Sequence, residues 1–153
     1  MNIKRLSLLF VIIFITTYLH ANPILLGLRG GNDNSGITLQ YYLDKENRVL
    51  EGIASLLFPG DNGIEFTGLY EYHFPFSDHE AFGWYIGWGV HLGFYDRPGN
   101  TDISLGPDGI LGFQYTFENI PLNLSIDWHP GFDIISDYRS RFSNVGISAR
   151  YVF

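Results

Sequence analysis

Residues 83–96 read GWYIGWGVHLGFYD, and two kinds of side chain alternate along this stretch with a period of two. One parity is large and apolar throughout: Trp84, Ile86, Trp88, Val90, Leu92 and Phe94. The other parity is small, aromatic or weakly polar: Tyr85, Gly87, Gly89, His91, Gly93 and Tyr95. Strict alternation predicts a β-strand, because successive side chains of a strand point to opposite faces. Neither face carries the Lys and Glu that a sheet normally shows to water.

Similar alternating segments recur along the chain, and each is closed by a turn signal. We expect strands at 24–31, 37–43, 48–58, 64–74, 83–96, 108–117, 122–129 and 144–153. An apolar period near 3.6 residues never persists long enough for a helix. An aromatic content of 17% and 18 glycines also suit sheet better than helix. The sequence therefore predicts one all-β domain of about eight strands joined as an up-and-down meander.

The kind of sheet depends on which face is buried. The polar set of the segments consists of Thr, Gln, Ser, Asn, His and Gly with scattered charges, which makes a poor surface for water. The inverted arrangement fits better, with the apolar set facing lipid and the polar set filling a narrow barrel. A bilayer offers no water to unpaired backbone groups, so a spanning sheet has to be closed. Eight strands leave an interior that side chains fill, which predicts a non-conducting barrel.

Strand length and aromatic placement agree with a transmembrane barrel. The segments 64–74 and 84–94 alternate over a length that matches the roughly 9 to 11 residues of a tilted spanning strand. Aromatic side chains of the apolar face are expected to form girdles at the two membrane interfaces. These are Tyr70, Tyr72, Trp84, Trp88, Tyr115, Trp128 and Tyr151.

Residues 1–21 have the pattern of a signal peptide for export. Lys4 and Arg5 precede an apolar run from Leu6 to Leu19, and the small residue Ala21 ends the segment. An apolar run of this length is short for a spanning helix, which favours cleavage near Ala21. The alternative is an uncleaved membrane anchor. The expected domains are a signal peptide over 1–21 and a barrel over 22–153.

Charge and cysteine content exclude several classes of function. Beyond residue 21 the chain carries seven Lys and Arg against sixteen Asp and Glu, a net charge of about −9. This acidic balance argues against a nucleic-acid partner. The chain has no cysteine, so it folds without disulfides and offers no thiolate ligand to a metal.

With these features the chain resembles the small eight-stranded outer-membrane β-barrel proteins of Gram-negative bacteria, the class that includes the membrane domain of outer-membrane protein A. The resemblance covers Pro23 to Phe153 and includes the ending Tyr151-Val152-Phe153. It implies a porin-like membrane protein located in the outer membrane, monomeric and surrounded by outer-membrane lipid. In this class Tyr151 and Phe153 would form the C-terminal signal that the outer-membrane assembly machinery recognises.

The resemblance also implies a topology. Both termini and the connections DKEN, PFSDHEA and ENIP would lie on the periplasmic side. The connections NDNSG, PGDNG, RPGNT and SDYRSR would face outward, and all four are short. Short outward connections argue against a role that depends on long projecting loops.

Charged residues on the inner parity predict a structural polar network. Arg29 and Arg150 lie on the first and last strands, which become neighbours when the barrel closes. They are natural partners for the inward carboxylates Glu51, Glu65, Glu71, Asp108 and Asp127, because an unpaired buried charge costs several kcal/mol. The predicted network comprises Arg29, Glu65, Glu71, His73, His91, Asp127, His129 and Arg150.

Catalytic and metal-binding interpretations explain the same residues less well than this network does. A metal site would need His73, His91 and His129 at one height of the barrel, and a polar plug explains them without one. Ser125, Asp127 and His129 suggest a nucleophile, but alternation places all three on one inner face, away from membrane lipid. We therefore expect no enzyme activity, no metal and no cofactor.

The predicted function is that of an integral outer-membrane barrel with a structural role in the envelope. A barrel that binds a small molecule or lipid, either membrane-embedded or soluble and lipocalin-like, is the alternative and requires an interior void. A lipid-modifying outer-membrane enzyme is the third possibility.

Overall fold

The computed structural model describes residues 22–32, 34–43, 47–57, 62–76, 79–97, 100–135 and 140–153. The segment predicted as a signal peptide lies outside these residues. Within them, no helix combines the length and apolar character needed to cross a membrane. The strands in chain order are β1 (Ile24–Gly31), β2 (Asn34–Tyr42), β3 (Arg48–Leu57), β4 (Asn62–Phe76), β5 (His79–Arg97), β6 (Asn100–Thr116), β7 (Leu122–Trp128), β8 (Gly131–Phe132), β9 (Ser140–Arg141) and β10 (Val145–Val152).

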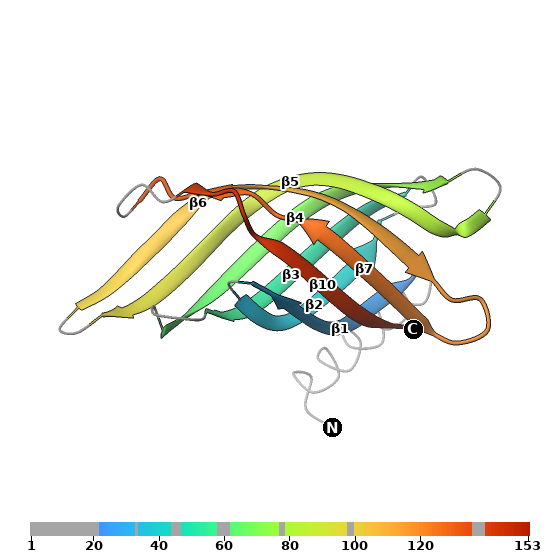
Figure 1. Ribbon diagram of the computed structural model, residues 1–153, viewed down its shortest axis with the longest axis horizontal. Helices are drawn as coiled ribbons and strands as arrows, with labels where there is room; N and C mark the ends of the chain where they lie inside the picture. The colour runs from blue at the N-terminus through green and yellow to red at the C-terminus, as the bar shows by residue number, and fades with distance from the viewer. Residues whose placement is uncertain are drawn as a thin grey trace, which may run out of the picture.

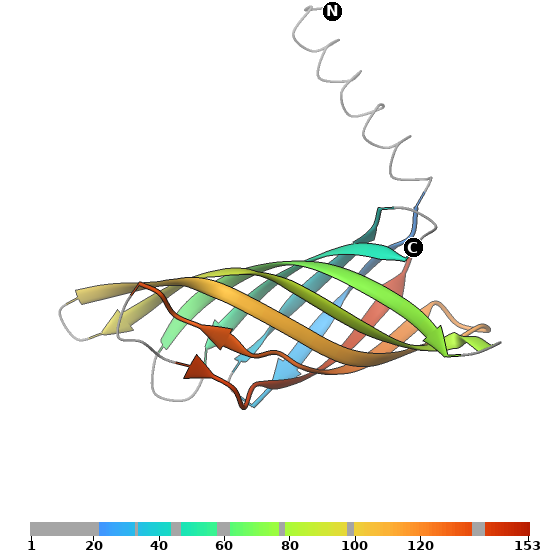
Figure 2. The same cartoon turned by 90° about the horizontal axis from the view of Figure 1, so that it is seen from above.

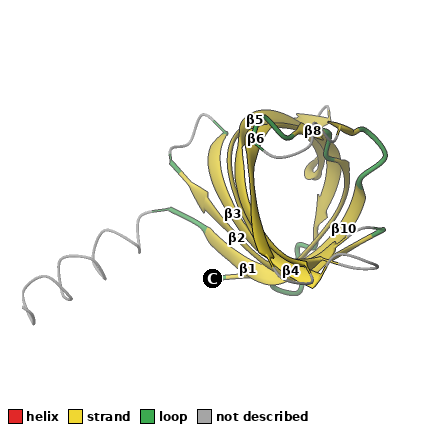
Figure 3. Cartoon of the chain, turned by 90° about the vertical axis from the view of Figure 1, so that its left-hand side faces the viewer, coloured by secondary structure: helices red, strands yellow, loops and turns green. Residues whose placement is uncertain are grey.

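Eight of these strands close into an antiparallel barrel, seen from the side in Figure 1 and end-on in Figure 3. Each strand from β1 to β6 pairs with the next along the chain, and β10 pairs with both β7 and β1. At the closing seam Leu28 of β1 lies opposite Ala149 of β10. The backbone N–H of Phe153 donates to the carbonyl of Ile24 at 2.9 Å. The predicted closed meander of eight strands is confirmed.

The two faces of the barrel have the inverted polarity that the sequence predicts. On β5, Trp88 and Val90 are 58% and 60% exposed on the outside, whereas Tyr85 and His91 are 0% and 1% exposed on the inside. Most of the buried side chains are polar or charged, and a small apolar cluster lies among them, formed by Ile53, Leu69, Tyr85 and Ile110. The interior is therefore held by hydrogen bonds as much as by apolar packing.

The start of β1 and the end of β10 mark one end of the barrel, which we call the terminal end. Pro23 accepts a backbone hydrogen bond from Tyr42 at 3.1 Å, and Pro121 accepts one from Val152 at 3.1 Å. The end of β2 and the residues after β6 therefore lie beside the start of β1 and the end of β10, respectively. Asn47, in the turn after β2, has a φ of 68°, a left-handed conformation that Asn adopts more readily than most residues. The opposite end, called the far end, carries the connection between β7 and β10 and the ends of β5 and β6, which project beyond their neighbours (Figure 2).

Strand β6 is longer than the predicted segment 108–117, because it begins at Asn100. Gly106 and Pro107 suggest a turn, but both lie within the strand, where Pro107 is opposite Val90 of β5. Pro107 has the same parity as Leu105 and Gly109. The carbonyl of Leu105 and the N–H of Gly109 form hydrogen bonds with the segment after β7 and so point away from β5. The missing N–H of Pro107 therefore falls on the side of β6 that has few partners, where proline is tolerated.

The connection between β7 and β10 is also longer than predicted. The sequence suggests a short outward loop at SDYRSR, residues 136–141, whereas the connection spans 129–144 and contains β8 and β9. Residues 136–139 lie outside the described part of the chain. Strand β7 ends at Trp128, opposite Leu111, so β6 continues beyond it with an open edge. β8 covers part of this edge through the pair Asp108 and Gly131, and the residues after β8 add a bridge between Leu105 and Ile135.

Candidate functional site: the polar interior

Arg150 of β10 is buried in the middle of the barrel and contacts three other strands. Its Nη2 donates to Glu51 Oε1 at 2.6 Å, and its Nη1 donates to Ser125 Oγ at 2.7 Å. Its Nε donates to Thr38 Oγ1 at 3.2 Å, and the Thr38 hydroxyl in turn donates to Glu51. Gln40 Nε2 also donates to Glu51, at 3.1 Å. The guanidinium thus joins β2, β3, β7 and β10 across the interior.

Arg29 of β1 forms a second ion pair. Its two terminal nitrogens donate to the two oxygens of Asp127 at 2.7 and 2.6 Å, a bidentate arrangement that fixes both groups. The Tyr85 hydroxyl donates to the same carboxylate at 3.0 Å. Gly146 of β10 leaves the space that the guanidinium occupies, because a Cβ at this position would overlap it. The absence of a side chain at Gly146 therefore allows the ion pair to form.

A third cluster, toward the terminal end, surrounds His73. Its Nε2 lies 2.7 Å from Glu71 Oε2, and its Nδ1 lies 2.8 Å from Gln114 Nε2. The Tyr42 hydroxyl lies 3.4 Å from the same Nδ1. The imidazole stacks on Tyr85, with ring centroids 4.9 Å apart. Aromatic stacking and hydrogen bonds together fix the ring in the interior.

The fourth cluster, the His91 cluster, lies toward the far end. His91 Nδ1 is 2.8 Å from Asp108 Oδ2, and Nε2 is 2.8 Å from Asp133 Oδ1. The Ser104 hydroxyl donates to Asp133 at 2.7 Å and lies 3.2 Å from His91 Nε2. His129 Nε2 is 3.6 Å from Asp108 Oδ1. An imidazole between two carboxylates can therefore link the barrel wall to Asp133, which lies outside the eight barrel strands.

The eight predicted network residues are all buried, but the structure divides them among separate clusters. It brings together Arg29 with Asp127, Glu71 with His73, and His91 with His129 through Asp108. Arg150 pairs with Glu51, a carboxylate that alternation also places inside. Glu65 lies on β4 opposite Ser55 and Gly93. It makes none of the hydrogen bonds described above.

Several side chains of the clusters were not predicted as members, and Tyr85, Ser104 and Asp133 are three of them. Alternation places Tyr85 inside without indicating a role, although it contacts both Asp127 and His73. Ser104 could have been found by continuing the alternation of β6 past Pro107, because Ile103 and Leu105 point outward on either side of it. Asp133 follows the short strand β8, and no periodic pattern in the sequence marks its contact with His91.

The side chains suggested as a nucleophilic group do not act as a unit. Ser125 Oγ accepts a hydrogen bond from Arg150, and Asp127 holds Arg29. His129 instead lies near Asp108. Among the described residues, no three His, Asp or Glu side chains converge as metal ligands either.

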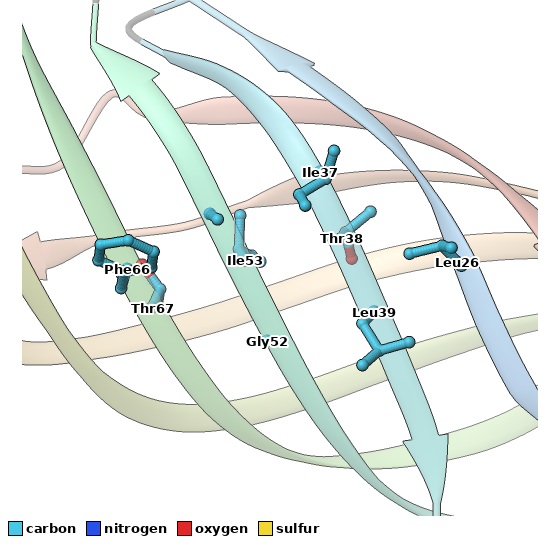
Figure 4. A pocket seen from close by; sticks show the side chains of 9 residues that line it. Leu26, Ile37, Thr38, Leu39, Gly52, Ile53, Phe66 and Thr67 are labelled. Atoms are coloured by element: carbon cyan, nitrogen blue, oxygen red, sulfur yellow. The ribbon is translucent and has the colours of Figure 1, made fainter.

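The outward face carries a shallow apolar groove of about 280 Å³ over β1 to β4. Figure 4 shows Leu26, Ile37, Leu39 and Phe66 around it, with Gly52 between them. A Cβ on Gly52 would meet no atom within 4 Å, so the groove arises from a missing side chain. This groove lies outside the barrel and is not the interior void that a small-molecule carrier requires.

Comparison with solved structures supports the architecture. The chain matches the crystal structure of the N-terminal β-barrel domain of Pseudomonas aeruginosa OprF with a TM-score of 0.71 and 12% sequence identity, over 86% of this chain and 98% of that one. A match to the crystal structure of Neisserial surface protein A (NspA) has a TM-score of 0.48 and 11% identity, over 86% of this chain and 93% of that one. No protein-family model matches the chain, and no curated protein matches it. The OprF likeness shows a shared fold.

Proposed function

We propose that this protein is a monomeric integral outer-membrane barrel that contributes to envelope structure, with an interior filled by side chains and closed to ions. In this proposal the segment 1–21 is a cleaved signal peptide. The barrel is delivered by the outer-membrane assembly machinery and is then surrounded by outer-membrane lipid. It carries out no catalysis and needs no cofactor.

The observation that carries the proposal is the polarity of the wall. Large apolar side chains are exposed on the outside of every barrel strand, while arginines and carboxylates are paired inside. Exposure of so much contiguous apolar surface to water would drive association, whereas lipid solvates it. Stacked rings on the outside, such as Phe76 on Phe82 at 5.1 Å and Phe74 on Trp84 at 4.5 Å, fit an interfacial girdle.

The four clusters described above support the closed interior of this proposal. Arg150, Glu51, Arg29 and Asp127 cross the barrel at its centre, and their side chains are 0% exposed. A conducting path would require these ion pairs to break, which leaves buried charges unpaired at a cost of several kcal/mol. These contacts therefore support the proposal that the polar interior contributes stability and does not transport ions or solutes.

The first experiment is the electrophoretic mobility of the protein from a membrane fraction, with and without boiling in SDS. A closed detergent-resistant barrel gives two mobilities, and a soluble protein without a mobility shift contradicts membrane insertion. The second experiment is swelling of liposomes in sugar solutions after reconstitution. We expect no swelling above that of protein-free liposomes, and rapid swelling would contradict the closed interior.

A further inference from the structure

Residues 130–135 form a strap that lies along the far end of the barrel, next to β6. Figure 3 shows β8, which belongs to this strap, at the rim beside β5 and β6. Its backbone contacts with β6 are few. Gly109 N donates to Pro130 O at 2.8 Å, Ile134 N and Ile135 N donate to Leu105 O at 2.8 and 3.3 Å, and Asp108 pairs with Gly131. In contrast, β7 pairs continuously with β6 from Leu111 to Thr116. Segments with few hydrogen bonds open at lower free energy than the rest of a fold.

The side chains of the strap divide between outside and inside. Phe132, Ile134 and Ile135 point outward and are exposed, whereas Asp133 is buried. The strap lies so close to β6 that a Cβ on Gly106 would overlap the carbonyl oxygen of Phe132. Only glycine at this position lets the strap backbone approach the inner side of the wall. This close approach brings the Asp133 carboxylate to His91.

Asp133 is the strap's one inward acidic side chain, and it meets two groups from the barrel wall. Its Oδ1 lies 2.8 Å from His91 Nε2 and accepts the Ser104 hydroxyl at 2.7 Å. His91 is held from its other side by Asp108 at 2.8 Å. Ser104 and His91 are each 1% exposed. Hydrogen bonds to charged groups are stronger than neutral ones, so this carboxylate contributes more to the attachment than a single backbone bond.

We propose that the strap is a detachable latch over the far end of the barrel, with Asp133 as the group that holds it closed. When Asp133 leaves, the strap separates from β6, and His91, Ser104 and Asp108 become accessible to the solution at that end. The ion pairs of Arg29 and Arg150 use other strands and remain intact. The His91 cluster at the far end therefore becomes accessible, while the ion pairs at the centre of the barrel stay buried.

This inference goes beyond the proposed envelope function and can be tested independently of it, with protein refolded in detergent. The chain has no cysteine, so a single introduced thiol reports on one position. Ser104→Cys places the reporter under the strap, and Ser148→Cys places a matched reporter of equal burial in the centre of the barrel. The measurement is the rate of alkylation by iodoacetamide, with folding of each variant checked by the mobility shift on boiling.

We expect Asp133→Ala to raise the alkylation rate of Ser104→Cys by about tenfold or more, the effect of losing a hydrogen bond to a charged group. The milder variant Asp133→Asn is expected to give an intermediate rate and serves if the alanine variant does not fold. Glu118→Ala, which removes an exposed carboxylate at the terminal end, should leave the rate unchanged. Ser148→Cys should react slowly in every background.

Two results would overturn the proposal. If Ser104→Cys reacts at the same rate whether Asp133 is present or replaced by alanine or asparagine, the carboxylate does not hold the strap. If the Asp133 substitutions accelerate Ser104→Cys and Ser148→Cys equally, the whole barrel has loosened and the strap does not move as a separate unit.

Discussion

Arg150 and Arg29 show how single residues stabilise an interior that has little apolar packing. Each guanidinium is enclosed by the barrel and contacts a carboxylate on a different strand, at 2.6 Å in both cases. Removal of one partner from a buried ion pair leaves the other charge unsatisfied, which costs much more than the pair itself contributes. The pairs therefore link strands that are not neighbours in the barrel wall, β1 with β7 and β10 with β3, as well as adding stability.

Arg150→Met is expected to lower the free energy of unfolding by about 3 to 5 kcal/mol, because Glu51 remains buried without its cation. The measurement is the urea unfolding transition in detergent micelles. The double variant Arg150→Met with Glu51→Gln should recover part of the loss, since it removes the uncompensated charge. Glu118→Gln, an exposed carboxyl in a turn, is the control and should shift the free energy by no more than about 0.5 kcal/mol. An unchanged midpoint for Arg150→Met would mean that the ion network adds no stability.

Two glycines with opposite surroundings provide a second test. Gly146→Ala places a methyl group on the Arg29 guanidinium, so the ion pair with Asp127 must shift, at an expected cost of about 1 to 3 kcal/mol. Gly52→Ala on the outward groove meets open space and should be neutral or stabilising by up to about 1 kcal/mol. Both are read from the same unfolding transition. Equal destabilisation by the two would show that the strand backbone, and not the guanidinium, requires glycine.

At the scale of the strands, alternation was sufficient to predict the barrel elements but not their full lengths. Every barrel strand was expected from the period of two, and the inward and outward sets are those that the structure shows. The pattern does not predict the first half of β6, because a proline with glycine before it is a turn signal. A strand tolerates Pro107 only where the missing N–H faces an edge with few partners, and the sequence does not show where such an edge lies. Likewise, no local pattern reveals that the connection 129–144 returns to β6, since this depends on where β7 stops.

Val90→Arg tests whether the outward face of β5 is in lipid. In a membrane barrel an arginine near the middle of the bilayer costs about 2 to 4 kcal/mol, whereas on a water-exposed strand the change would be close to neutral. The measurement is the unfolding free energy after refolding into phospholipid vesicles. Ile120→Arg, in the turn at the terminal end, is similarly exposed but should cost about 0 to 1 kcal/mol. Equal, small effects at both positions would favour a water-exposed wall.

For the whole molecule, closure is the property that connects sequence to architecture. The sequence predicted that the first and last strands meet, from strand number and from the absence of water in a bilayer. It also placed the charged residues inside. It could not show which inward residues meet, because the contacts depend on register and strand tilt: Arg29 reaches Asp127 on β7, and His91 reaches Asp133 beyond β8. Such pairings are properties of the closed barrel and not of any one strand.

The seam between β1 and β10 allows a direct test of closure within one chain. Leu28 and Ala149 lie opposite each other on the outward face, and opposite residues of antiparallel strands have Cα atoms about 4.5 to 5.5 Å apart, within the range of a disulfide. Oxidation of Leu28→Cys with Ala149→Cys should therefore give a looped monomer that migrates faster than the reduced chain after boiling in SDS. The control pair Leu28→Cys with Val90→Cys joins strands that do not pair and should remain reduced. Disulfide-linked dimers in place of the looped monomer would mean that the seam forms between two chains, in which case the closed barrel is not a monomer.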